Sequence, residues 1–225
     1  MSVLLVMAKA PVPGVVKTRL APPATPAQAA RIAAAALLDT LDAVRAVPGA
    51  VPVLALSGRL DDAERGAELA VALAGWTVFA QRGAGLGERL ANAHAEVAVA
   101  FPGQAVVQIG MDTPQLTPAR LGAAIRRLAS ADAALGRAVD GGWWALGLRD
   151  PRHAAALRTV PMSTARTAWH TRAALDERGL RPAALPVLRD VDEWPDALAV
   201  AAEATGSRFA RQVAAVRPLP AGGRR

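Results

Sequence analysis

Short apolar runs alternate with longer, alanine-rich stretches along most of the chain. Apolar runs of this length, bounded by glycine, proline or charged residues, predict buried strands. We expect strands at 3–8, 51–56, 76–81, 104–110, 132–138, 143–148 and 183–188. The alanine-rich stretches predict helices at about 26–47, 61–73 and 86–99, from 118, and at 163–178 and 195–205. The alternation predicts an α/β domain whose mostly parallel sheet is covered by helices on both faces.

Threonine–proline pairs mark the start of two predicted helices, at 25–26 and 117–118. The threonine can accept a hydrogen bond from the first turn, and proline suits the first helical position. By the same chemistry, Ser163 or Thr164 is expected to cap the helix over 163–178; the alternative is that this helix N-terminus binds an anion.

The composition fits one cytoplasmic domain. A chain of 225 residues, 52% of them hydrophobic, is long enough to bury a core. The absence of cysteine excludes disulfides, thiolate metal sites and cysteine nucleophiles. The first apolar run is far too short to span a membrane, and no signal-peptide pattern precedes it. We expect one domain over 1–210 and a basic, flexible tail over 211–225.

The formal net charge of +7 changes this picture little. Outside the tail, arginine and lysine are dispersed rather than gathered in a block, as on solvated helix faces. There is no tyrosine and there are only three phenylalanines, so a stacking platform for single strands is not expected. We therefore expect a small-molecule substrate and no nucleic-acid partner.

Most residues with chemical potential follow predicted strands. The segments are "KAPVPGVVKTRL", "QRGAGLGERL", "GMDTPQL", "VDGGWW" and "RDVDEWPD". In open α/β sheets, ligands bind at the carboxyl ends of the strands. These segments are therefore expected to surround one site.

The loop after the first strand carries Lys9, Lys17 and Arg19. It is not a P-loop, because Val16 stands where that motif needs a glycine before the lysine. Lysine and arginine both suit phosphate oxygens, and backbone N–H groups around Gly14 could add donors. The alternative is a basic loop that faces only water.

Three aspartates indicate a metal site. Asp112 ends the strand at 104–110, where it either binds Mg²⁺ or caps a turn. Asp190 and Asp192 are two residues apart, so they can point to one side of an extended segment. With Asp112 they would complete a divalent-ion site; otherwise they form an acidic turn before the last helix.

Two glycine-rich segments each have two interpretations. The segment 83–90 either lets backbone approach a ligand or forms a flexible turn into a helix. Its Glu88 stands where the dinucleotide fingerprint needs glycine, so a nicotinamide site is not indicated. Asp140 before two glycines either borders a ligand or makes a hairpin turn.

Together, and in this order, these motifs resemble a bacterial family of GT-A-fold proteins. The family is described as nucleotide-diphospho-sugar transferase-like or glycosyltransferase-like, and the resemblance covers about residues 3–200. The matching residues are Pro11, Pro13, Gly14, Lys17, Thr18, Arg19, Leu20, Gln81, Leu86, Gly87, Glu88, Arg89, Asp112, Pro114, Asp140, Gly141, Gly142, Ser163, Thr164, Asp190 and Asp192. The resemblance implies a three-layer α/β/α sandwich of the Rossmann-like GT-A type.

The resemblance also implies roles for the matching residues. Lys17, Arg19 and Asp112 would be catalytic, and Asp112 with Asp192, or Asp190 as second choice, would hold Mg²⁺ or Mn²⁺. The nucleotide would bind to Lys9, Gly14, Lys17, Arg19, Gln81, Gly87 and Glu88. The acceptor would bind to Asp140, Gly141, Gly142, Trp143, Ser163 and Thr164.

This chain departs from the family pattern only in its acceptor half. Trp143 replaces a tyrosine, Met162 replaces a tryptophan, and Arg137-Ala138 stand where a proline is usual. The function implied is metal-dependent nucleotidyl transfer from an NTP to a phosphorylated acceptor, with release of pyrophosphate. The alternatives are glycosyl transfer from a nucleotide-diphosphate sugar and, less favoured, a non-enzymatic nucleotide- or nucleic-acid-binding module.

Overall fold

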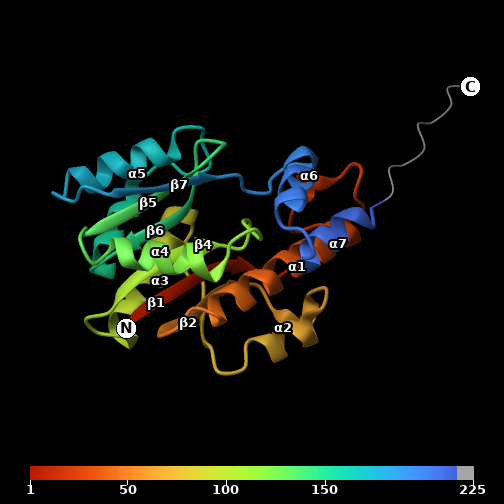
Figure 1. Ribbon diagram of the computed structural model, residues 1–225, viewed down its shortest axis with the longest axis horizontal. Coiled ribbons are helices and arrows are strands. Elements are labelled where there is room, and N and C mark those ends of the chain that lie inside the picture. Colours follow the sequence, from red (N-terminus) through yellow and green to blue (C-terminus); the bar gives the residue numbers. More distant parts are fainter. Residues whose placement is uncertain (217–225) are drawn as a thin grey trace, which may run out of the picture.

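A strand forms at each of the seven predicted places. The computed structural model describes residues 1–216, in which these strands form one sheet (Figure 1). They are β1 (Ser2–Lys9), β2 (Ala50–Ser57), β3 (Thr77–Ala80), β4 (Ala105–Gly110), β5 (Ala133–Ala138), β6 (Trp143–Leu148) and β7 (Ala183–Leu188).

The sheet is mostly parallel, in the order β3-β2-β1-β4-β6-β5-β7. β6 is antiparallel to both of its neighbours, β4 and β5, and β7 is parallel to β5. The β5–β6 hairpin turns at residues 139–142, so the "DGG" segment does form a hairpin. Because β1, β4, β5 and β7 run in one direction, the loops that follow them meet at one edge of the sheet.

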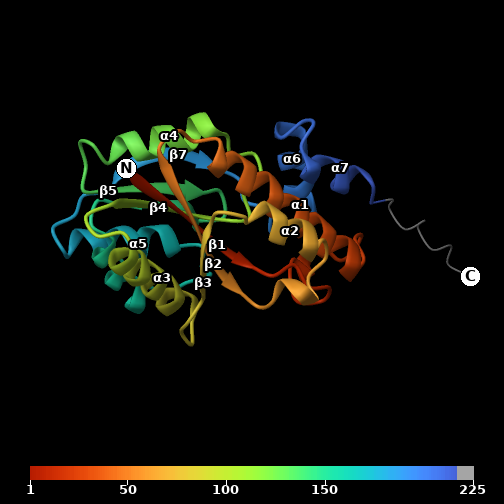
Figure 2. The ribbon, with the colours of Figure 1, turned by 90° about the horizontal axis from the view of Figure 1, so that it is seen from below.

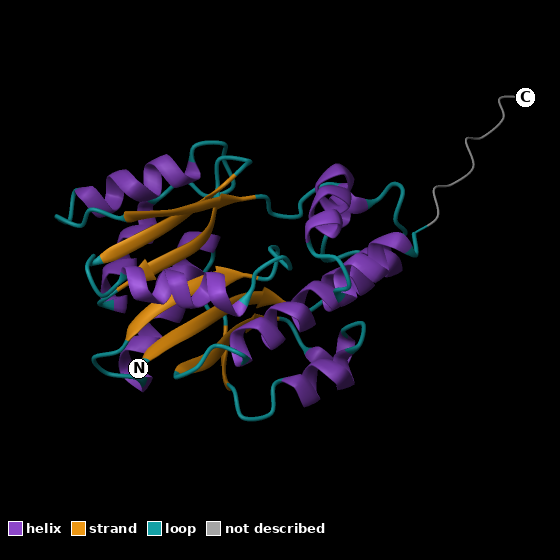
Figure 3. Cartoon of the chain, in the orientation of Figure 1, coloured by secondary structure: helices purple, strands orange, loops and turns teal. Residues whose placement is uncertain are grey.

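Helices account for most of the remaining chain (Figure 3). The α-helices are α1 (Pro26–Arg45), α2 (Gly66–Ala72), α3 (Leu86–Ala100), α4 (Pro118–Arg127), α5 (Thr167–Asp176), α6 (Trp194–Glu203) and α7 (Arg208–Ala214). Short 3-10 helices are η1 (Thr18–Leu20), η2 (Leu60–Asp62) and η3 (Pro151–Thr159). Among the described residues, α7, η1 and η3 were not expected. None of the helices in residues 1–216 combines the length and apolar character that crossing a membrane requires.

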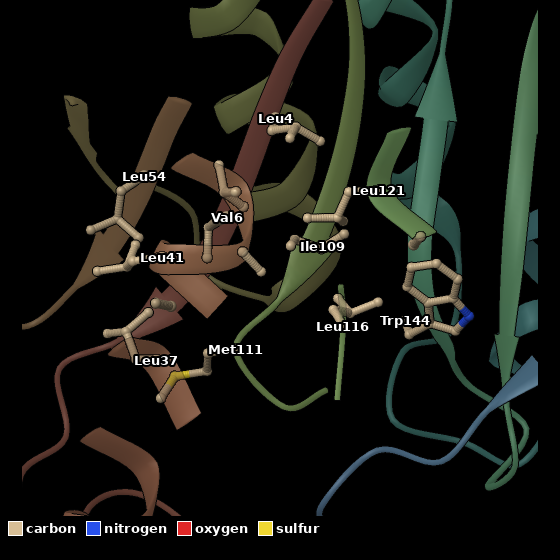
Figure 4. Packing of buried hydrophobic residues seen from close by; sticks show 14 of the residues in the cluster. Leu4, Val6, Leu37, Leu41, Leu54, Ile109, Met111, Leu116, Leu121 and Trp144 are labelled. Carbon is tan, nitrogen blue, oxygen red and sulfur yellow. The ribbon is translucent and has the colours of Figure 1, made fainter. Parts of the chain in front are cut away.

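The two faces of the sheet carry separate cores. Leu4 and Val6 of β1 pack with Ile109, Leu121 and Trp144 beneath α1 and α4 (Figure 4). The alternate residues of β1 join the second core, under α3, η3 and α5. Figure 2 shows the sheet between these two helical layers. The expected α/β/α sandwich is therefore confirmed.

A third apolar cluster holds the C-terminal helices against α1. Ile32 of α1 packs with Val200 of α6 and with Phe209 and Val213 of α7. The carboxylate of Asp39 on α1 accepts hydrogen bonds from the first backbone N–H groups of α7. The predicted boundary of the tail, at residue 211, lies too early in the chain, because residues 211–214 belong to α7. Residues 217–225 of the predicted tail lie outside the described residues.

Two of the three predicted helix caps are confirmed. The Thr25 side chain accepts from the Gln28 N–H in a capping box, and Thr117 accepts from Arg120 N–H at 3.3 Å. The third prediction was wrong, because α5 begins only at Thr167. Before that helix, the Thr167 hydroxyl accepts from the Thr164 N–H, which makes a separate turn.

Candidate active site

A cleft of about 700 Å³ opens at the carboxyl ends of β1, β4, β5 and β7. Loops after these strands line it, together with the start of α3 and the segment 162–167. Twelve of the predicted site residues lie on its wall: Lys9, Lys17, Arg19, Gln81, Asp112, Asp140, Gly142, Trp143, Ser163, Thr164, Asp190 and Asp192. The strand-end residues therefore do surround one cavity.

Lys17 is the most constrained cation of the cleft. Its side chain is only 12% exposed, and its backbone is left-handed, with φ 48°. The ammonium donates to the Val191 carbonyl and lies 2.5 Å from Asp112 and 3.6 Å from Asp192. These contacts join the loop after β1 to the loops after β4 and β7.

The carboxylates keep the Lys17 ammonium charged. Burial by itself lowers the pKa of a lysine. Here Asp112, and then Asp192 and Asp190, more than offset the burial, so the pKa of Lys17 is raised above its usual value. The cleft thus contains a permanent positive charge beside its acidic wall.

The other residues of the loop after β1 are less constrained. The Arg19 side chain is 71% exposed and reaches Asp192 at 3.5 Å, and the exposed Lys9 donates to its own loop at the Val15 carbonyl. Gly14 lies outside the cleft wall, in a turn with φ +76°. The N–H groups of the two residues after it donate to the Val12 carbonyl, so they are not free phosphate donors.

Three carboxylates form a cluster next to the Lys17 ammonium. Asp140 comes from the β5–β6 turn, and Asp190 and Asp192 follow β7. One oxygen from each lies within 4.8 Å of the other two. Oxygens around one Mg²⁺ are at most about 4.2 Å apart, and Mg²⁺ and Mn²⁺ prefer oxygen donors. The set fits such an ion after a small side-chain adjustment.

The electrostatics of the cluster agree with this fit. Partial burial, and next the charge of Asp140, raise the pKa of Asp190 to about 6. Asp192 and Asp112 add to the effect. The cluster thus concentrates negative charge, which a divalent cation would neutralise.

The structure divides the acidic residues differently from the sequence-based hypothesis. That hypothesis placed Asp112 with Asp192 on the metal and Asp140 with the acceptor. In the structure, Asp140 joins Asp190 and Asp192, while Asp112 pairs closely with Lys17. The sequence could not show this, because it depends on how far the β5–β6 turn reaches over the sheet edge.

The residues of α3 that line the cleft are not the ones predicted to bind the nucleotide. Gly87 and Glu88 lie outside the cleft wall, and Leu86, Arg89 and Leu90 line it instead. A β-carbon on Gly87 would overlap the Leu157 carbonyl, so this glycine permits close packing of α3 on η3. Glu88 accepts from the Ala84 N–H and orders the turn.

Gln81 has a structural role at the cleft wall. Its amide N–H₂ donates to the carbonyls of Ala8 and Ala55, at 2.9 Å each. These bonds tie the segment after β3 to the neighbouring strands β1 and β2. Gln108 of β4, which the sequence analysis did not single out, also lines the cleft, with its side-chain oxygen buried and unpaired within residues 1–216.

The remaining wall carries the residues expected for the acceptor. The Trp143 indole N–H donates to the Thr171 hydroxyl at 3.1 Å, which fixes the ring against α5. Ser163 has a left-handed backbone, with φ 58°, and Thr164 accepts from the Arg166 N–H. Gly141 is the exception, because it faces a second hollow rather than the cleft.

This mostly parallel, seven-stranded α/β/α sheet is the Rossmann-like GT-A fold of nucleotide-diphospho-sugar transferases, and a basic loop and an acidic cluster lie at its carboxyl edge. The chain belongs to a bacterial family, since residues 40–164 match the family described as "Uncharacterized protein conserved in bacteria (DUF2064)". A search of curated protein sequences finds no significant match.

Comparison with solved structures gives the same fold. A protein of Desulfovibrio desulfuricans G20, provisionally described as a nucleotide-diphospho-sugar transferase, is 26% identical, with a TM-score of 0.81 over 95% of this chain and 94% of that one. Rv0371c of Mycobacterium tuberculosis H37Rv, solved with manganese, is 19% identical, with a TM-score of 0.54 over 96% and 100%. A 4-diphosphocytidyl-2C-methyl-D-erythritol synthase is 12% identical, with a TM-score of 0.52 over 84% and 88%.

Proposed function

We propose that this protein is a metal-dependent nucleotidyltransferase that joins the nucleotidyl group of an NTP to a phosphorylated small-molecule acceptor. The position of Lys17 carries the proposal. Its charged ammonium is held at the cleft wall between Asp112 and Asp192, next to Arg19. Such a pair of cations suits the β- and γ-phosphates of a triphosphate.

The similar structures support a nucleotide substrate and a divalent ion. One similar structure is provisionally described as a nucleotide-diphospho-sugar transferase, and another is a 4-diphosphocytidyl-2C-methyl-D-erythritol synthase. Rv0371c, solved with manganese, shares the fold. The oxygen donors of Asp140, Asp190 and Asp192 suit the same kind of ion.

In the proposed reaction, an oxygen of the acceptor phosphate forms a bond to the α-phosphorus of the NTP. The bond from that phosphorus to the bridging oxygen breaks, and pyrophosphate leaves with its electron pair. Lys17 and Arg19 neutralise the leaving pyrophosphate, and Asp112 positions Lys17. Asp140, Asp190 and Asp192 would hold the divalent ion, which supplies positive charge to phosphate oxygens. The protein contributes positioning and electrostatics rather than a covalent intermediate.

The test is pyrophosphate release from each NTP with a panel of sugar phosphates and phosphonates, with Mg²⁺ or Mn²⁺. We expect one NTP to react and also to raise the melting temperature when the metal is present. Lys17→Met and Asp192→Asn should each lower kcat/KM by about a hundredfold or more. Arg59→Met and Asp61→Asn are matched controls, because that exposed ion pair lies away from the cleft. Absence of both NTP binding and pyrophosphate release over the whole panel would refute the proposal.

A second candidate is glycosyl transfer from a nucleotide-diphosphate sugar. It is favoured by the spacing of Asp190 and Asp192, a pair of acids separated by one residue, because both side chains reach the same cluster. Many glycosyltransferases of this fold use an Asp-x-Asp pair to hold the metal. Release of a free nucleoside diphosphate from a nucleotide sugar, without pyrophosphate from any NTP, would select this candidate.

A further inference from the structure

A second hollow, of about 370 Å³, lies between β5 and α5 on the α3 side of the sheet. Three arginines and a tryptophan surround it: Arg137, Arg166, Arg172 and Trp169. Leu135 and Ala168 are among its apolar lining residues, and its lining contains no carboxylate. We call it the arginine hollow. The proposed reaction does not use it, although Gly141 of the family pattern is among its lining residues.

The arginines of the hollow have almost no internal counterions. Within residues 1–216, the side chains of Arg137 and Arg166 make neither an ion pair nor a hydrogen bond. Arg172 pairs only with Asp176, at 3.7 Å on the exposed surface of α5, where such pairs contribute little. Three arginines line one hollow whose lining has no carboxylate, so the hollow is positively charged and would attract an anion.

Arg137 is the one exposed residue of β5, and it lines the hollow together with Leu135, two residues before it. Every other residue of β5 is buried, and the pairing register shifts next to Arg137 on both sides of the strand. The residue before it must be small, because a β-carbon on Gly136 would lie 2.5 Å from the Trp144 ring. Irregularities of this kind re-aim side chains and are over-represented beside functional sites.

Trp169 offers a flat apolar surface at the same place. The residue is 64% exposed, and His170 meets its ring edge-on, with 4.8 Å between the ring centroids. No cation–ring contact of this indole occurs within residues 1–216. An open aromatic face beside guanidinium groups suits a ligand that carries an anion next to a ring.

We propose that the arginine hollow binds a phosphate monoester carried on a flat ring. The arginines would take the phosphate through their planar donor groups, and Trp169 would stack on the ring. The site is separate from the cleft but adjacent to it, because Ala165 lines both cavities and its carbonyl lies against Gly141. This inference does not depend on the proposed function.

The test uses phenyl phosphate as the probe, with EDTA present, and follows the tryptophan indole N–H signals by NMR. Assignment uses Trp169→Phe and Trp143→Phe. We expect phenyl phosphate to shift the Trp169 signal and to bind more tightly than inorganic phosphate or phenol alone. The Arg137→Ala/Arg166→Ala double variant should weaken binding by about tenfold or more.

Two controls separate the hollow from general charge and from the cleft. Arg126→Ala/Arg127→Ala removes the same charge from α4, on the opposite face of the sheet, and should leave the affinity within about twofold. Lys17→Met alters the cleft, and it should also leave the affinity for phenyl phosphate unchanged. The proposal is overturned if phenyl phosphate does not bind, if it shifts Trp143 instead of Trp169, or if both arginine double variants weaken binding equally.

Discussion

His94 gives the fold a defined sensitivity to acid. The residue lies on α3 with none of its surface exposed, and neither ring nitrogen has a hydrogen-bond partner within residues 1–216. Burial lowers the pKa of His94 to about 4, against a smaller opposing effect of the nearby Gln108 side chain. The imidazole is therefore neutral in the native state over the pH range in which it becomes charged in the unfolded chain.

The size of the effect follows from linkage. Between pH 6.5 and pH 4, the unfolded state binds a proton that the native state does not, so the free energy of unfolding falls as the pH falls. The shift from 6.5 to about 4 corresponds to about 3 kcal/mol lost by pH 4, and about 2 kcal/mol lost by pH 4.5. Above pH 6.5 the contribution is fully present.

The measurement is urea unfolding of the wild type and of His94→Leu at pH 7, 5.5 and 4.5. Other groups also titrate, so the informative quantity is the difference between the two proteins at each pH. From pH 7 to pH 4.5, the free energy of unfolding of His94→Leu should rise by about 2 kcal/mol relative to that of the wild type. His170→Gln, on the surface of α5, is the control and should follow the wild type. Parallel pH dependences of wild type and His94→Leu would refute the reasoning.

Four substitutions test other contacts. Gly87→Ala should destabilise the fold by about 1–3 kcal/mol in urea unfolding, because its β-carbon would overlap the Leu157 carbonyl, and an unchanged midpoint would contradict that packing. Gly122→Ala on α4 is the matched substitution, expected to stabilise by up to about 1 kcal/mol, since it meets only the flexible end of Arg126 at 3.3 Å. Lys17→Met should tighten Mn²⁺ binding by about tenfold, measured by calorimetry, because it removes a positive charge 3.6 Å from Asp192. Weaker Mn²⁺ binding in this variant would argue against the acidic cluster as the metal site. Asp39→Ala should speed amide hydrogen exchange in α7 while leaving β4 protected, because it removes the carboxylate that accepts from the first N–H groups of α7.

Local rules were sufficient to place most elements. The strand over 183–188 was predicted to the residue, and the caps at Thr25 and Thr117 formed as expected. Each of these features depends on neighbours within a few positions, through hydrophobic periodicity or a side chain bonding to its own first turn. The prediction that Ser163 or Thr164 caps the helix was wrong for a reason that is also local. The Thr167 hydroxyl accepts from the Thr164 N–H, so a turn forms where the cap was expected.

The sequence by itself also determined which residues stand at strand ends, and hence most of the cleft wall. Only the tertiary structure decided how those residues pair. Lys17 meets Asp112 from 95 positions away, and Asp140 meets Asp190 and Asp192 because β5 lies between β6 and β7. Strand order and loop reach are set by the packing of the whole sheet, and charges interact according to distance in space rather than along the chain. The sequence therefore determined which charged residues surround the cleft. The fold decided that they form a lysine–aspartate pair and a three-carboxylate cluster.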